Sequence, residues 1–185
     1  MRNLSALASL ALALALAVPA AAQSGPSSSS PAVPASVPTY YPLYGVSGGI
    51  VVPAGRLSDD HSAGYGLEGF VEYAVPNQPY ALRGEGMFQR FALKSGRTTG
   101  KSVNLFAIGP TVMYQVQQAP TQTYLTGGIA IYNASGEGTH PGFNFGGGLG
   151  FPLTGFWATA EARMHVMLSS GRPVLTLPLS VGVKF

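Results

Sequence analysis

Apolar and polar side chains alternate along most of the chain after residue 42. Because successive side chains of a strand point to opposite faces, strict alternation predicts a strand with one apolar and one polar face. No stretch in this part is apolar over the roughly 18 residues of a transmembrane helix. The C-terminal segment is the clearest case, and its apolar positions are Leu175, Leu177, Leu179, Val181, Val183 and Phe185.

Eight segments of this kind follow one another, each about as long as the 9–11 residues with which a tilted strand crosses a bilayer. The connections after the first, third, fifth and seventh segments are on average longer than the other three. Short turns at one end and longer loops at the other are typical of outer-membrane barrels. The predicted strands are residues 43–52, 65–74, 80–91, 102–115, 121–133, 142–151, 156–167 and 174–185.

Two positions in these segments do not fit a regular ladder. Pro110 and Pro178 lie inside predicted strands, and a closed sheet has no edge at which a missing N–H is harmless. We therefore expect a β-bulge at each proline, or strand limits that are wrong there. The register of segment 102–115 is also open, because two sets of residues compete for its outer face: Phe106, Ile108, Val112 and Tyr114 against Val103, Leu105, Ala107 and Met113.

The N-terminus has the three parts of a secretory signal peptide. Arg2 provides the basic start, Leu4–Val18 the apolar run, and Ala20–Ala22 the small residues before a cleavage site. The run is shorter than the roughly 20 residues that span a bilayer as a helix. The serine- and proline-rich stretch that follows has no periodicity and is typical of an extended tether. The sequence thus predicts a signal peptide at 1–22, a Ser/Pro-rich periplasmic tether at 23–42 and a barrel at 43–185.

Composition decides which face of the sheet points inward. Charged residues make up 9% of the 185 residues, against about 25% in an ordinary soluble domain. Four of the seven acidic residues lie inside predicted strands, on the face opposite the apolar one. Lipid outside accepts an apolar face, and a narrow eight-stranded interior accepts paired charges. There are no cysteines, which excludes disulfides, thiolate metal sites and cysteine nucleophiles.

The inward charges are expected to form a structural network. The short connection 75–79 predicts a hairpin in which Glu72 lies opposite Arg83, so that opposite charges meet across the ladder. Lys184 shares the inward face by alternation, and His165 is a further candidate. An unpaired charge there is costly, so we expect these side chains to pair and to fill the lumen. The predicted network consists of Glu68, Glu72, Arg83, Glu85, Glu161 and Arg163.

Four stretches carry a resemblance to a known family: Tyr124–Tyr132, Phe143–Pro152, Ala160–Arg163 and Leu179–Phe185. Together, after a signal peptide, they make residues 43–185 resemble the small bacterial outer-membrane β-barrel family, similar to the OmpA transmembrane domain and OmpX. The resemblance implies an all-β, eight-stranded, antiparallel up-and-down transmembrane barrel in the bacterial outer membrane, present as a monomer. It also implies that the barrel-assembly machinery reads the terminal strand, with Phe185 as part of the assembly signal. Members of the family have varied or unknown roles.

Three motifs match catalytic sites in their residue types but not in their context. Gly45–Gly49 fits G-x-S-x-G, but a strand continues where a nucleophile elbow needs a helix. Gly96–Ser102 resembles a phosphate loop, but it has three residues between its glycines, one too few, and a strand follows it. Glu161, His165 and Ser169 are of the types that a lipase or deacylase uses. Glu161 and His165 are, however, about 13 Å apart along one strand, too far for a direct hydrogen bond.

Loop residues give one further signal. A cluster of four basic residues without an intervening acid follows the third segment, and guanidinium and ammonium groups suit the phosphates of lipopolysaccharide. A solvated basic loop explains the cluster equally well. Acidic and histidine residues of two other loops lack the spacing of metal ligands. The possible lipopolysaccharide contacts are Arg90, Lys94, Arg97 and Lys101.

The sequence therefore predicts an outer-membrane barrel with a filled, charge-paired interior and a structural or surface-interaction role, without catalysis, cofactor or metal. Expected partners are outer-membrane lipid, lipopolysaccharide and the barrel-assembly machinery, and no nucleic acid. Three alternatives stay open: a small-solute pore, an outer-membrane lipid-modifying enzyme, and a soluble barrel that binds an apolar ligand. The sequence does not specify a surface partner.

Overall fold

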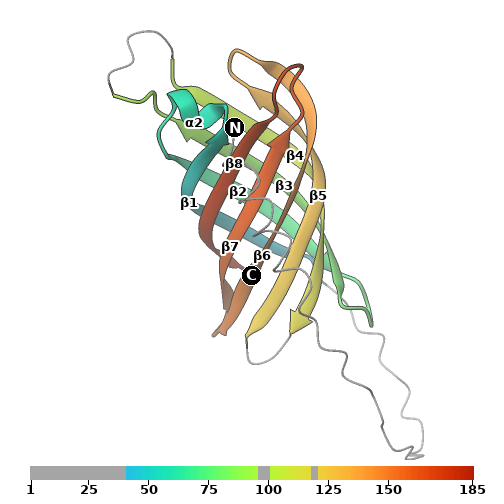
Figure 1. Ribbon diagram of the computed structural model, residues 1–185. Coiled ribbons are helices and arrows are strands. Elements are labelled where there is room, and N and C mark those ends of the chain that lie inside the picture. The colour runs from blue at the N-terminus through green and yellow to red at the C-terminus, as the bar shows by residue number, and fades with distance from the viewer. Residues whose placement is uncertain (1–40, 96–100, 118–120) are drawn as a thin grey trace, which may run out of the picture. The chain divides into compact units, whose positions relative to one another are not determined.

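Eight strands close into a barrel in which each pairs antiparallel with its neighbour in the sequence (Figure 1). In this computed structural model, residues 41–95, 101–117 and 121–185 are described. The last strand pairs with the first, so the sheet has no free edge. The predicted all-β, eight-stranded, up-and-down barrel is confirmed. The predicted signal peptide and nearly all of the predicted tether lie outside the described residues.

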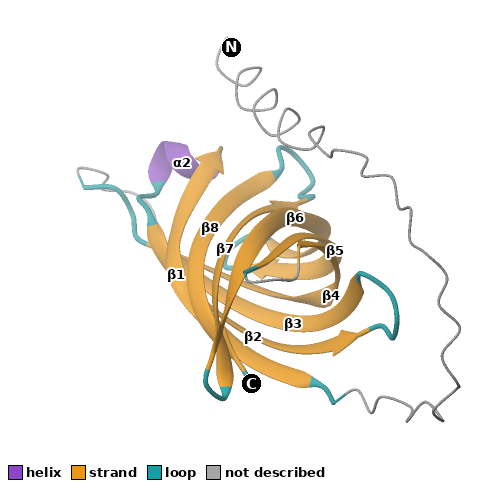
Figure 2. Cartoon of the chain, turned by 90° about the horizontal axis from the view of Figure 1, so that it is seen from below, coloured by secondary structure: helices purple, strands orange, loops and turns teal. Residues whose placement is uncertain are grey.

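All eight predicted segments are strands, and Figure 2 shows them as a closed ring. A four-residue helix lies between the first two strands. Among the described residues, no helix is long and apolar enough to cross a membrane. The elements are β1 (Leu43–Gly55), α2 (Leu57–Asp60), β2 (Gly64–Ala74), β3 (Tyr80–Phe91), β4 (Val103–Gln117), β5 (Gln122–Ala134), β6 (Gly138–Leu153), β7 (Phe156–Met167) and β8 (Val174–Lys184).

The barrel has two distinct ends. One, which we call the α2 end, carries α2 and the connections after β1, β3, β5 and β7; the other, the C-terminal end, carries Phe185 and the remaining turns. The largest difference from the predicted strand limits is that β6 begins at Gly138 rather than at residue 142. Gly136 and Gly138 have φ angles of 87° and 85°, which glycine adopts without a Cβ clash. They make the β5–β6 hairpin tight, so at the α2 end the longer connections are those after β1, β3 and β7.

The register of β4 settles which of its two apolar sets faces outward. Ile108 is 70% exposed, whereas Leu105 and Met113 are buried inside the barrel. Phe106 lies beside Phe88 of β3 on the outer wall, with ring centroids 4.9 Å apart. The outward set is therefore Phe106, Ile108, Val112 and Tyr114.

Neither proline produces the expected β-bulge. The β4–β5 ladder lacks the pairs at Gly109 and Pro110 but resumes in the same register, and the β7–β8 ladder does the same around Pro178. Each proline remains paired in register with the neighbour on its other side, Gly84 or Val51. A residue without an N–H opens the ladder on one side only, so the strand continues. The register shift that β4 does have lies further on, between Gln115 and Gln117.

The barrel interior has two layers. At the α2 end it is apolar, and Leu57 of α2 packs into this layer. Towards the C-terminal end the interior is mainly polar and charged, with a small apolar cluster of Ala81, Met113 and Tyr124. The buried residues of the apolar layer are Val51, Leu57, Met87, Phe91, Leu105, Ala130, Tyr132, Ala134, Met167 and Val174.

Candidate functional site: the charged interior

Charged side chains enter the barrel from four strands, β2, β3, β7 and β8, because the alternation places them on the inward face. Even-numbered positions of β2 and odd-numbered positions of β3 and β7 point inward. Arg83 and Arg163 are each only 2% exposed. Charged groups at this depth persist only when they are paired and hydrogen-bonded.

Arg83 joins three strands. Glu72 lies opposite Arg83 in the β2–β3 ladder, so the predicted hairpin register is confirmed. Arg83 Nη2 donates to Glu72 Oε2 at 3.1 Å, and Nη1 donates to Glu161 Oε2 of β7 at 3.1 Å. The guanidinium carbon lies 4.1 Å from the ring centroid of Phe70, a cation–π contact. The Tyr124 ring lies further away, at 6.0 Å, and Glu68 Oε1 lies 3.9 Å from Nη1, so two close carboxylates and the Phe70 face are the main contacts of the side chain.

Arg163 is the centre of the network because it contacts three carboxylates. Its Nη2 donates to both oxygens of Glu68, at 2.8 and 2.9 Å. Its Nε donates to Glu161 Oε1 at 2.7 Å, and its Nη1 donates to Glu85 Oε1. The planar fork of an arginine suits such multidentate binding, whereas a lysine offers one point charge. The structure therefore places all six residues of the predicted network in contact.

Lys184 is a seventh member, which the predicted set left out. Its Nζ donates to Glu72 Oε1 at 3.0 Å and to Gln122 Oε1 at 3.2 Å. The six predicted residues carry four negative and two positive charges, and Lys184 changes their formal sum from −2 to −1. The alternation of the C-terminal strand predicts that Lys184 points inward. It does not predict the partner, because Glu72 is 112 residues away and is brought next to Lys184 by the closure of the barrel.

Neutral side chains add hydrogen bonds to two carboxylate oxygens that the arginines also bind, Glu85 Oε1 and Glu161 Oε2. Thr111 and Asn144 donate to Glu85 Oε1 at 2.9 and 3.4 Å. The Tyr124 hydroxyl donates to Glu161 Oε2 at 3.0 Å. No local sequence pattern distinguishes these residues from other inward polar ones, because their partners lie on strands distant in the sequence.

The residues considered for hydrolysis are engaged elsewhere. Glu161 is held by the two arginines, while His165 Nδ1 lies 3.0 Å from the Tyr132 hydroxyl. Ser169 donates to the carbonyl of Arg172 in the β7–β8 loop. Gly45–Gly49 lies within the continuous strand β1. Across the described parts of the chain, no group of three or more histidine, aspartate or glutamate residues is placed to hold a metal ion.

The basic cluster lies at the α2 end of the barrel, where Lys94 contacts the backbone of α2. Arg90, Lys94 and Lys101 are exposed, and Arg97 lies outside the described residues. Lys94 Nζ donates to the carbonyl of Ser58 at 2.6 Å, and the Lys94 amide donates to the carbonyl of Asp60 at 2.9 Å. The cluster is therefore next to α2 with its two acids, which reduces its positive potential.

Phe185 closes the barrel at the C-terminal end. Its amide and carbonyl exchange hydrogen bonds with Tyr44 of β1, at 2.9 and 2.8 Å. Its side chain is 61% exposed on the outer wall. The terminal residue therefore extends the β1–β8 seam and presents an aromatic ring outward.

Comparisons with known proteins bear on the fold. No family model and no curated protein matches the chain. Neisserial surface protein A is similar in structure, with a TM-score of 0.61 and 16% identity over 77% of this chain and 95% of that one. The Yersinia pestis outer membrane protein Ail, solved in a phospholipid bilayer nanodisc, has a TM-score of 0.51 and 14% identity over 78% of this chain and 100% of that one. The chain thus has the fold of the small eight-stranded outer-membrane β-barrels.

Proposed function

We propose that this protein is an outer-membrane barrel with a filled, charge-paired interior, that its role is structural or surface-interacting, and that it is not an enzyme. The observation that carries the proposal is the inversion of the usual soluble arrangement. Large apolar side chains cover the outside, with Ile108, Val181 and Ile129 more than two-thirds exposed, while buried ion pairs occupy the inside. Soluble monomers rarely expose an apolar surface of this extent.

Aromatic residues at one level of the outer wall support the membrane placement. Tyr44, Tyr73, Tyr80 and Tyr114, one on each of the strands β1 to β4, are exposed near the end of the barrel that carries the C-terminus. Tyrosine has an apolar ring and a polar hydroxyl, so it suits the boundary between hydrocarbon and headgroups. These four residues fit the periplasmic aromatic girdle of a barrel.

The two interior layers favour a closed lumen over a pore. The network around Arg83 and Arg163 crosses the barrel from β2 and β3 to β7, and the apolar layer lies between it and the α2 end. An ion that passed through would have to break buried ion pairs and then cross apolar side chains without hydration, which is costly.

Conductance tests the filled interior. The protein recovered from the detergent-extracted membrane fraction is expected to give no sustained single-channel current in planar bilayers at neutral pH. The matched control is a known open porin purified in the same detergent. Steady currents that scale with the amount inserted would favour the small-solute pore, and recovery of the protein from the soluble periplasmic fraction would contradict the membrane placement.

The barrel-assembly machinery is the proposed partner of the terminal strand. Deleting Phe185 is expected to lower membrane insertion in cells far more than folding into detergent micelles. Phe185→Ala keeps the two backbone bonds to Tyr44 and so isolates the aromatic ring. Phe156→Ala, which removes another exposed aromatic from the C-terminal end, is the control and should insert normally. Equal losses in cells and in micelles would mean that Phe185 only packs.

Lipopolysaccharide is the proposed ligand of the basic cluster. Replacing Arg90, Lys94, Arg97 and Lys101 by glutamine should weaken lipopolysaccharide association several-fold at low salt, and the difference should shrink as salt screens the charges. Arg172→Gln, in the β7–β8 loop at the same end of the barrel, is the control for a single lost charge. Association that is unchanged by the four replacements at every salt concentration would contradict the proposal.

A further inference from the structure

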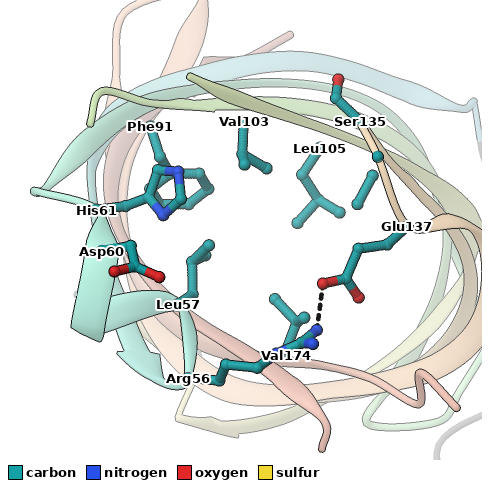
Figure 3. Close-up of a pocket in the computed structure, with 12 residues that line it drawn as sticks. Arg56, Leu57, Asp60, His61, Phe91, Val103, Leu105, Ser135, Glu137 and Val174 are labelled. Carbon is teal, nitrogen blue, oxygen red and sulfur yellow. Dashed lines mark hydrogen bonds and ion pairs between the residues drawn. The ribbon is translucent and has the colours of Figure 1, made fainter. Parts of the chain in front are cut away.

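The mouth of the barrel at the α2 end contains a pocket that the charged interior does not explain. Its volume is about 280 Å³, just below the roughly 300–1,000 Å³ of typical small-molecule pockets. In Figure 3 the side chains stand in a ring around an open centre. Its apolar wall is formed by Leu57, Phe91, Val103, Leu105 and Val174.

An ion pair lies on the rim of this pocket. Arg56, just before α2, pairs with Glu137 of the β5–β6 turn (Figure 3). The two side chains are 40% and 32% exposed, so both are within reach of a molecule in the pocket. The pair uses Arg56 Nη2 and Glu137 Oε1, which leaves N–H donors on the guanidinium and the second oxygen of the carboxylate outside this bond.

These groups define what the pocket fits. Its walls remove apolar surface from water, which stabilises an alkyl or aromatic body. At the rim, a hydroxyl group can donate to the free oxygen of Glu137 and accept from Arg56 without separating the pair. A carboxylate head group would be repelled by Glu137. A head group without a hydrogen-bond donor could not bind the second carboxylate oxygen of Glu137.

We propose that this pocket binds a small, uncharged amphipathic molecule, with an alkyl or aromatic body against the apolar wall and a hydroxyl head on the Arg56–Glu137 pair. The site is at the barrel mouth and is separate from the ion-pair network in the interior. It adds a ligand class to a barrel whose proposed role is structural or surface-interacting.

A matched pair of probes tests the head group. 4-Propylphenol and 4-propylanisole share a body, but only the phenol has an O–H donor. Each is titrated into methyl-labelled protein in nanodiscs, and NMR shifts are followed at Leu57, Leu105 and Val174. The lipid-facing methyls of Leu179 report partitioning into the bilayer. We expect saturable shifts at the pocket methyls only, with the phenol binding roughly five- to tenfold tighter because it forms one more hydrogen bond.

Two sets of variants decide the outcome. Ala134→Phe fills the pocket and should abolish the saturable shifts, whereas Ala162→Phe places the same side chain on the outer wall and should not. Val103→Phe, which enlarges a side chain of the apolar wall that points into the open centre in Figure 3, is the second filling variant if Ala134→Phe does not fold. Glu137→Ala should remove the preference for the phenol, and Glu137→Gln, which retains an acceptor oxygen, should restore most of it.

The contrary results are distinct. Pocket methyls that shift without saturation, in parallel with Leu179, would overturn the proposal because the probes would only be partitioning. Equal affinity for phenol and anisole, or a phenol preference that survives Glu137→Ala, would overturn the assignment of the hydroxyl to the rim. Neither result bears on the conductance of the barrel. The proposed ligand site and the proposed filled interior can therefore be refuted separately.

Discussion

Replacing Arg163 with alanine is expected to lower the free energy of unfolding by about 3–5 kcal/mol, the range for removing one partner of a buried ion pair. The expected loss is at the upper end of this range because the change leaves three interior carboxylates, Glu68, Glu85 and Glu161, without their shared cation. Only Glu161 keeps a close cation, Arg83 at 3.1 Å; Glu68 lies 3.9 Å from the same guanidinium. The measurement is urea unfolding in lipid vesicles, followed by the fluorescence of Trp157, the single tryptophan.

Two controls separate position from charge. Arg56→Ala removes an arginine from an exposed ion pair and should cost less than about 1 kcal/mol, as surface pairs do. Arg163→Lys keeps the charge but not the fork that reaches three carboxylates, so it should fall between the wild type and Arg163→Ala. If Arg163→Ala and Arg56→Ala destabilise the barrel equally, the interior network is not a major source of its stability.

Local alternation was enough to predict the barrel and most of the network. The face on which a strand residue lies depends only on its parity, so the inward positions of Glu68, Glu85 and Arg163 were accessible from the sequence. The Glu72–Arg83 register was accessible too, because a short hairpin fixes the pairing of its two strands. Both predictions need only residues that are close together in the sequence.

Features that depend on closure could not be predicted in this way. The Lys184–Glu72 contact joins residues 112 apart, and the Arg163–Glu68 contact joins residues 95 apart across the lumen. Both depend on how the strands are staggered around the barrel, which no single strand encodes. The early start of β6 depends on the φ angles of Gly136 and Gly138, which the sequence permits but does not require.

The prolines show a related limit. A bulge was expected because a proline removes one ladder bond, and a bulge is one way to accommodate that loss. The structure instead leaves out two pairs and keeps the register on both sides. A register shift would move every following side chain to the other face. In β4 that would turn Ile108 or Met113 towards the wrong surface, so the local gap disturbs the strand less than a bulge.

Removing Arg83 alone is expected to destabilise the barrel more than removing Arg83 and Glu72 together. The seven interior charges sum to −1: four carboxylates, two arginines and Lys184. Arg83→Ala changes this sum to −2 and leaves Glu72 with Lys184 alone. The double change Arg83→Ala, Glu72→Ala returns the sum to −1, and Lys184 keeps its bond to Gln122 while Glu161 keeps Arg163.

A double-mutant cycle measures this difference. For residues in one ion-pair network the coupling free energy is about 0.5–3 kcal/mol. Here we expect the double variant to be more stable than Arg83→Ala alone. The reference cycle pairs Arg83→Ala with Glu137→Ala on the rim of the mouth, where the two effects should add, because Glu137 pairs with Arg56 and not with the interior. If the Glu72 cycle is additive as well, each charge is stabilised by its general surroundings rather than by its partner. The side chains of the filled interior would then contribute independently to stability. Replacing Glu72 would change the free energy of unfolding by the same amount whether or not Arg83 is present.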